Sequence, residues 1–140
     1  QRFFFFLFKQ KTAYEIVFVY WSSDVGSSDL FGRRRWLPDI HSRNQVVRGN
    51  AERNAINAPL QGSAADIIKI AMVRIAERLE REMPEAKMIL QVHDELIFEV
   101  DAGTVEKLRM LVTEEMKGAA DLAIPLEVDT GTGNNWLEAH

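Results

Sequence analysis

Two apolar runs on either side of a short polar break constrain the fold of this chain more than any other feature. Residues 88–92 and 96–100 are mostly apolar, and they flank His93, Asp94 and Glu95. Strand-forming runs that alternate in polarity and are separated by a few polar residues are typical of an antiparallel β-hairpin. The sequence therefore predicts a hairpin over about residues 87–100.

The polar break itself is unusual for a tight turn. It contains neither Asn-Gly nor Asp-Gly, the pairs that suit a two-residue hairpin loop best. An imidazole and carboxylates in their place indicate a working site. The alternative is that Asp94 tolerates turn geometry and remains solvated, and the hairpin alone leaves both interpretations open.

Helical periodicity predicts the elements that would cover this hairpin. Apolar residues recur at helical spacing from Ser63 to about Glu82, and again from Val105 to about Lys117. A short helix is expected near residues 45–55, with a break or a new helix start around Asn57 and Pro59. Ser63 to Asp66 is similar to a helix N-terminus.

A third strand is expected at Leu126–Val128, followed by a turn at Gly131–Gly133. Helix, strand, strand, helix, strand is an order that favours an α+β fold, a small antiparallel sheet packed against helices on one face.

Residues 1–30 differ from the rest of the chain. The run Phe3–Phe8 is apolar but far too short to span a bilayer, and residues 21–30 are rich in Ser and Asp. Residues 9–16 and 21–30 resemble the two halves of a translated short-read sequencing adapter. We therefore predict that residues 1–30 are an artefactual or disordered leader, and we set them aside from functional argument.

Composition bounds the remaining possibilities. A length of 140 residues suits one domain, and the absence of cysteine excludes disulfides and thiolate metal sites. Residues 31–53 hold six arginines and two acids, a net charge of +4 in a chain whose net charge is −4. Because a planar guanidinium group can donate two parallel hydrogen bonds to an oxyanion, this stretch indicates a surface that binds phosphate.

Four motifs carry a resemblance to a known family. Gln91–Leu96 resembles the last catalytic motif of bacterial family A DNA polymerases, the DNA polymerase I family. Three further segments are similar to elements of that family and follow in matching order, namely Phe31–Arg35 with Leu37–Ile40, Ala51–Asp66, and Gly133–Trp136 with the terminal Ala139-His140. The resemblance covers residues 31–140, which are expected to form the C-terminal part of a polymerase palm, without fingers or thumb.

The resemblance implies roles for residues of the hairpin. Asp94 corresponds to one of two essential aspartates and is the expected metal ligand, in an enzyme that uses two Mg²⁺ ions for phosphoryl transfer. Glu95 would assist this catalytic site or be a solvated acid. His93 resembles the residue that contacts the primer end, with a structural hydrogen-bonded histidine as the alternative.

The resemblance also implies DNA contacts. Arg53, Asn57 and Gln61 are spaced four apart and would form one polar line on a continuous helix. Such side chains reach minor-groove acceptors, which look alike across base pairs. The three are therefore expected to track primer–template DNA, and the arginines of residues 33–35 (Arg33, Arg34 and Arg35) are weaker phosphate-contact candidates.

The same resemblance sets limits on activity. The family's other essential aspartate lies in an upstream motif reading roughly Asp-Tyr-Ser-Gln, which this sequence lacks. A fragment of a cytoplasmic, nucleoid-associated bacterial enzyme is expected, one with no membrane association. The whole enzyme would add deoxynucleotides from deoxynucleoside triphosphates to a primer in replication and repair. This chain alone is expected to be inactive.

Two alternatives remain open from the residues. One is a non-catalytic nucleic-acid-binding module that uses the arginine-rich stretch. The other is a metal-dependent phosphohydrolase of the His-Asp type, in which His41, His93 and Asp94 would be ligands and Asp101 or Asp129 would complete the set. Because such sites usually lie on helices, the second alternative requires residues 88–100 to be helical.

Overall fold

The computed structural model describes residues 3–11, 26–123 and 125–139. The chain divides into two compact units. The sheet unit combines residues 1–13 with residues 67–140, and the arginine unit comprises residues 14–66. The boundary between the two units, at residues 66 and 67, lies inside a helix. The domain extent expected from the sequence, residues 31–140, stays a prediction.

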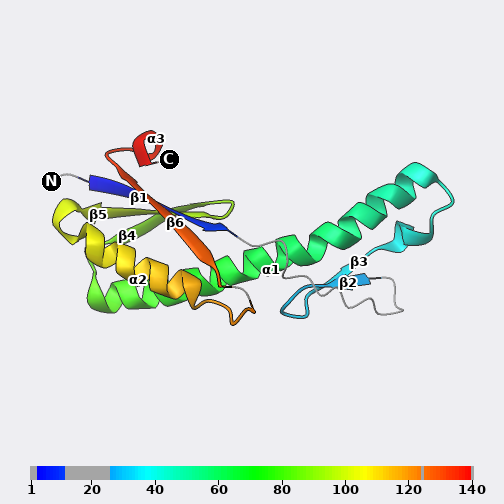
Figure 1. Ribbon diagram of the computed structural model, residues 1–140, viewed down its shortest axis with the longest axis horizontal. Helices are drawn as coiled ribbons and strands as arrows, with labels where there is room; N and C mark the ends of the chain where they lie inside the picture. Colours follow the sequence, from blue (N-terminus) through cyan, green and yellow to red (C-terminus); the bar gives the residue numbers. More distant parts are fainter. Residues whose placement is uncertain (1–2, 12–25, 124, 140) are drawn as a thin grey trace. The chain divides into compact units, whose positions relative to one another are not determined.

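The sheet unit is built on a four-stranded antiparallel sheet (Figure 1). Its strands are β4 (Lys87–Val92), β5 (Glu95–Asp101), β1 (Phe3–Lys11) and β6 (Glu127–Gly133), in that spatial order. β4 and β5 form the predicted hairpin, with a register irregularity between Met88 and Leu90. The predicted third strand is confirmed as β6.

Two helices cover one face of this sheet. In Figure 1, α2 (Val105–Lys117) lies alongside the C-terminal part of α1 (Gln45–Glu82). Leu96, Phe98 and Val100 alternate along β5 and are buried in one apolar cluster with residues of both helices. The α+β architecture expected from the sequence is therefore confirmed.

The opposite face of the sheet carries the short helix α3 (Trp136–Ala139). Ala139 packs with Ile97 of β5 and with Val92 of β4. The glycines expected to form a turn lie inside β6 instead, because α3 approaches the strand backbone closely. A Cβ added at Gly133 would lie 2.6 Å from the Cβ of Glu138, and one added at Gly131 would overlap the Ala139 carbonyl.

An ion-pair network joins α1 to α2. The guanidinium of Arg78 donates hydrogen bonds to Glu82 on its own helix, and to Glu114 (2.7 Å) and Glu115 (2.9 Å) on α2. Hydrogen bonds from Arg78 and Arg81 lower the pKa of the Glu82 carboxyl below its ordinary value.

The N-terminal segment differs from its expected place outside the fold. Phe3–Lys11 forms the strand between β5 and β6, and it pairs with β5 over Phe3–Lys9 and with β6 over Phe5–Lys11. An apolar segment can fill such a position because β5 and β6 each offer a row of backbone donors and acceptors. Residues 12–25 lie outside the described residues, and the adapter origin of this segment stays a prediction.

Helix α1 also differs from expectation, because it continues through Pro59 instead of breaking there. A proline inside a helix removes one backbone hydrogen bond and costs about 3 kcal/mol. The cost is offset by burial, since residues at spacing four form a buried stripe: Ala51, Ala55, Pro59 and Ser63. Ser63 is therefore a mid-helix residue, whose hydroxyl accepts a hydrogen bond from the Leu30 N–H at 3.0 Å.

The arginine unit combines the N-terminal half of α1 with a small ribbon. β2 (Gly26–Ser28) pairs with β3 (Arg34–Trp36), and the 3₁₀ helix η2 (Pro38–His41) follows. Between the two strands, both Phe31 and Arg33 donate a backbone N–H to the Asp29 carboxylate. No helix among the described residues is long and apolar enough to cross a bilayer.

Candidate functional site

The hairpin turn places Asp94 at the tip between two paired strands. Val92 and Glu95 form the last pair, so His93 and Asp94 alone make the turn. The Asp94 side chain is half-buried. Strands on both sides restrict the backbone of this carboxylate more than an open loop would, which suits a residue that must hold a fixed position.

His93 adopts a left-handed backbone conformation with φ of 54°. It is the one non-glycine residue with positive φ in the part of the chain that the structure describes. The side-chain amide of Gln91 donates a hydrogen bond to the His93 carbonyl at 3.0 Å, which restrains the turn. A costly conformation that persists with such support is typical of a functional site.

Glu95 is not a solvated acid, which corrects one of the two roles considered for it. Its exposed fraction is only 6%. The residue begins β5, and its register partner on the neighbouring strand β1 is Lys9. Burial follows from this central pairing, which could not be anticipated from the sequence while residues 1–30 were placed outside the fold.

Arg53, Asn57 and Gln61 lie on one continuous helix, as the polar line requires. All three side chains are exposed, while the intervening stripe at Ala55 and Pro59 is buried. The guanidinium of Arg53 donates a hydrogen bond to the Asn50 amide oxygen one turn earlier. These residues belong to the arginine unit, whereas Asp94 belongs to the sheet unit.

Arg33, Arg34 and Arg35 line a cavity of about 410 Å³ together with Gln61 and Gly62. Arg33 is engaged internally, because its guanidinium lies 2.6 Å from the Asp66 carboxylate. Gly62 leaves room for the buried Asp29 side chain, since a Cβ there would lie 2.6 Å from a carboxylate oxygen. The cavity thus gathers three arginines together with Asp29, and Arg33 is paired with acids of the same unit.

The ligand chemistry of Asp94 fits Mg²⁺, which takes carboxylate oxygens. Among the described residues, however, no group of three or more His, Cys, Asp or Glu side chains is placed to hold a metal ion. Asp94 therefore fits the part of one ligand, and a full set for two ions is not gathered in these residues.

The phosphohydrolase alternative is not supported by the structure. It required a helix over residues 88–100, and this segment forms β4 and β5. His41 lies in η2 of the arginine unit and His93 in the sheet unit.

Two features were not predicted from the sequence. The Gln91 amide supports the turn, and a polar residue in an otherwise apolar strand was its only signal. Trp36 lines a second cavity with Asn50 and Asn54 of α1. The i, i+4 spacing of the two asparagines was visible in the sequence, but it has meaning only on a continuous helix.

Comparison with known proteins identifies the class. The model of DNA polymerase family A matches residues 17–138, so the chain belongs to this family. The match begins inside the segment that was expected to be a leader.

Similar proteins include DNA polymerase I of Pseudomonas aeruginosa, 53% identical over 111 residues, and of Mycobacterium bovis, 50% identical over 113 residues. The alignments cover 79% and 81% of this chain but only 12% of each relative. A solved structure, the POL domain of Pol1 from M. smegmatis in complex with DNA primer-template and dNTP, is 48% identical with a TM-score of 0.78. That match covers 82% of this chain and 20% of the neighbour.

Proposed function

We propose that this chain is part of the palm of a DNA-directed DNA polymerase, in which Asp94 holds a divalent cation and Arg53, Asn57 and Gln61 track primer–template DNA. The observation that carries the proposal is the continuity of α1 through Pro59, which aligns the three exposed polar side chains at spacing four. Arginine and amide side chains in one line suit the degenerate acceptors of the minor groove.

The residues of the turn have complementary parts in this proposal. When bound, Mg²⁺ neutralises charge on the attacking and leaving oxygens of phosphoryl transfer. Asp94 supplies a carboxylate ligand from a rigid tip, and His93 contacts the primer end. Glu95, buried at the start of β5, supports the site from within the sheet.

The parent enzyme adds deoxynucleotides to a primer 3′ end in the bacterial cytoplasm during replication and repair. Its substrates would be primer–template DNA and deoxynucleoside triphosphates, the molecules with which the solved M. smegmatis neighbour forms its complex. The present chain alone does not polymerise, because one carboxylate cannot hold both ions. Arg34 and Arg35 contribute phosphate contacts.

Primer extension with the full chain and magnesium tests the inactivity. We expect no nucleotide addition. Measurable addition that disappears in Asp94→Ala would contradict the inactivity while supporting the assignment of Asp94. Addition that persists in Asp94→Ala would contradict both.

Duplex binding tests the proposed DNA contacts. Asn57→Ala and Gln61→Ala should each weaken binding of a blunt duplex about fivefold or more, by loss of about 1 kcal/mol per hydrogen bond. Ile56→Ala, an exposed residue beside the line, is the matched control. Duplex affinity is measured by fluorescence anisotropy. If all three variants lose affinity equally, the polar side chains make no specific contact with the duplex.

A non-catalytic nucleic-acid module is the second candidate, favoured by the arginine-lined cavity. The same anisotropy assay separates the two candidates when it is run with and without Mg²⁺. Binding that strengthens with Mg²⁺ and loses this response in Asp94→Asn supports the polymerase palm. Duplex binding that changes neither with Mg²⁺ nor in Asp94→Asn supports the non-catalytic nucleic-acid module.

A further inference from the structure

A second cavity of the arginine unit lies beside Trp36 and shares only Arg35 with the function proposed above. Its volume is about 240 Å³, below the range of about 300–1,000 Å³ typical of drug-sized ligands. The lining is mixed. Apolar residues supply part of it (Trp36, Leu37, Pro38, Val47 and Ala51), and the others are polar or charged (Arg35, Asp39, Asn50 and Asn54). Apolar walls with a few amide groups suit a small planar heterocycle that carries hydrogen-bonding edges.

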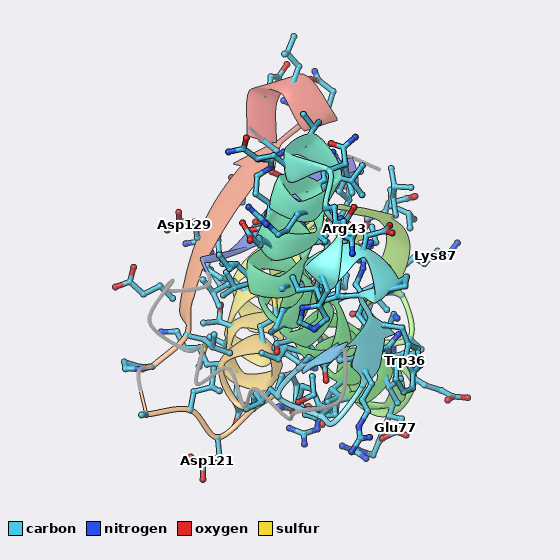
Figure 2. The ribbon with its side chains drawn as sticks, turned by 90° about the vertical axis from the view of Figure 1, so that its right-hand side faces the viewer. Trp36, Arg43, Glu77, Lys87, Asp121 and Asp129 are labelled. Carbon is cyan, nitrogen blue, oxygen red and sulfur yellow. The ribbon has the colours of Figure 1, made fainter. Side chains whose placement is uncertain are left out.

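Trp36 is the most unusual component of this cavity. Its side chain is 68% exposed, and Figure 2 shows it projecting outward from β3. A large aromatic ring held at the surface by a paired strand offers a flat face for stacking. Stacking on aromatic rings is how proteins bind unpaired bases with little sequence preference.

Arg35 links this cavity to its cationic neighbour. The residue lines the cavity beside Trp36 and also the cavity lined by Arg33 and Arg34. A base against Trp36 would therefore have the Arg35 guanidinium beside its flanking phosphate. A cation beside an aromatic platform is the combination that single-stranded nucleic-acid sites use.

We propose that the Trp36 cavity binds an unpaired base of single-stranded nucleic acid, with the adjoining phosphate against Arg35. This proposal rests on the DNA-binding function above, and it adds a site for a strand that is not base-paired. Asn54 would meet the edge of the base, and because an amide both donates and accepts, it would tolerate different bases. The amide oxygen of Asn50 accepts a hydrogen bond from Arg53, so Asn50 would offer its N–H group.

The test uses the full chain and two labelled probes at one fixed salt concentration, a short oligothymidylate and a blunt duplex. Fluorescence anisotropy should show that Trp36→Ala weakens oligothymidylate binding by roughly a factor of ten. Duplex binding should not change. Trp36→Phe, which keeps an aromatic face, should retain most of the affinity.

Two further variants keep the test decisive. Asn54→Leu replaces an exposed helix residue and should weaken oligothymidylate binding without affecting the duplex. Val46→Ala, at another exposed apolar position of the same unit, should change neither. Circular dichroism of each variant checks that the fold is retained.

Several outcomes overturn the proposal. One is unchanged oligothymidylate binding in both Trp36→Ala and Asn54→Leu, and another is an equal loss for both probes. A third outcome is that inorganic polyphosphate displaces the oligonucleotide equally well from wild type and from Trp36→Ala. That result would show that the oligonucleotide is held by charge attraction alone. If the wild-type chain binds oligothymidylate through Trp36 but does not bind the duplex, the duplex-tracking function is refuted and the proposal for the Trp36 cavity is supported.

Discussion

The turn residue His93 stores conformational strain beside the carboxylate of Asp94. Left-handed backbone costs an ordinary L-residue roughly 1–2 kcal/mol. Histidine is one of the few residues enriched there, and asparagine adopts this conformation more readily because its short side chain can hydrogen-bond locally. We predict that His93→Asn raises the free energy of unfolding by about 0.5–1 kcal/mol. Urea denaturation measures this change.

His41→Asn is the control for this prediction, because His41 is not among the residues with positive φ. A gain of similar size at both positions would show that the effect has nothing to do with the turn. If His93→Asn is more stable than the wild type, the native histidine lowers stability, which would support the proposed role of His93 at the primer end.

At the scale of single residues, the sequence was sufficient to predict that Asp94 lies in the turn, but not that Glu95 is buried. A carboxylate between two apolar runs is visible from hydrophobic alternation, and it lies in the turn as expected. Burial of Glu95 depends on which strand lies beside β5. That neighbour comes from residues far away in the sequence, so no local pattern could reveal it.

At the scale of the elements, the packing of α3 against β6 depends on two glycines, Gly131 and Gly133. An added Cβ at Gly133 would lie 2.7 Å from the Ala139 backbone nitrogen, too close for a carbon atom. We predict that Gly133→Ala lowers the free energy of unfolding by about 1–3 kcal/mol, because α3 must shift off the sheet. Thermal or urea unfolding measures the loss.

Gly103→Ala is the matched control for the α3 prediction, since an added Cβ there meets no atom within 4 Å. Equal stability of the two variants would contradict the close packing of α3 on β6.

The elements also show where local rules reach their limit. The bounds of α2 and of the hairpin followed from periodicity and alternation. The break expected at Pro59 was wrong, because a local rule counts the lost hydrogen bond and cannot count the buried stripe that offsets it. The glycines of β6 were assigned to a turn because nothing in the sequence indicates a helix packed against them.

For the molecule as a whole, acid stability should depend on the link between α1 and α2. Hydrogen bonds from Arg78 and Arg81 lower the pKa of Glu82 from its ordinary 4.5. A lowered folded-state pKa means that the stabilisation is complete above about pH 4.5 and is lost as the pH falls through the folded value. We predict that Glu82→Gln makes stability less dependent on pH below about 4.5.

Denaturant midpoints measured between neutral and acidic pH test this prediction. Glu80→Gln, an exposed neighbour on the same helix, is the control. The prediction fails if the two variants and the wild type lose stability in parallel as the pH falls.

The position of β1 has a consequence for how the chain reaches its fold. β1 leaves the ribosome well before the two strands that pair with it, β5 and β6. Those partners begin only at Glu95 and Glu127, so sheet closure waits until β6 has been synthesised. Such long-range pairing slows folding, and an aromatic run left unpaired meanwhile is prone to self-association.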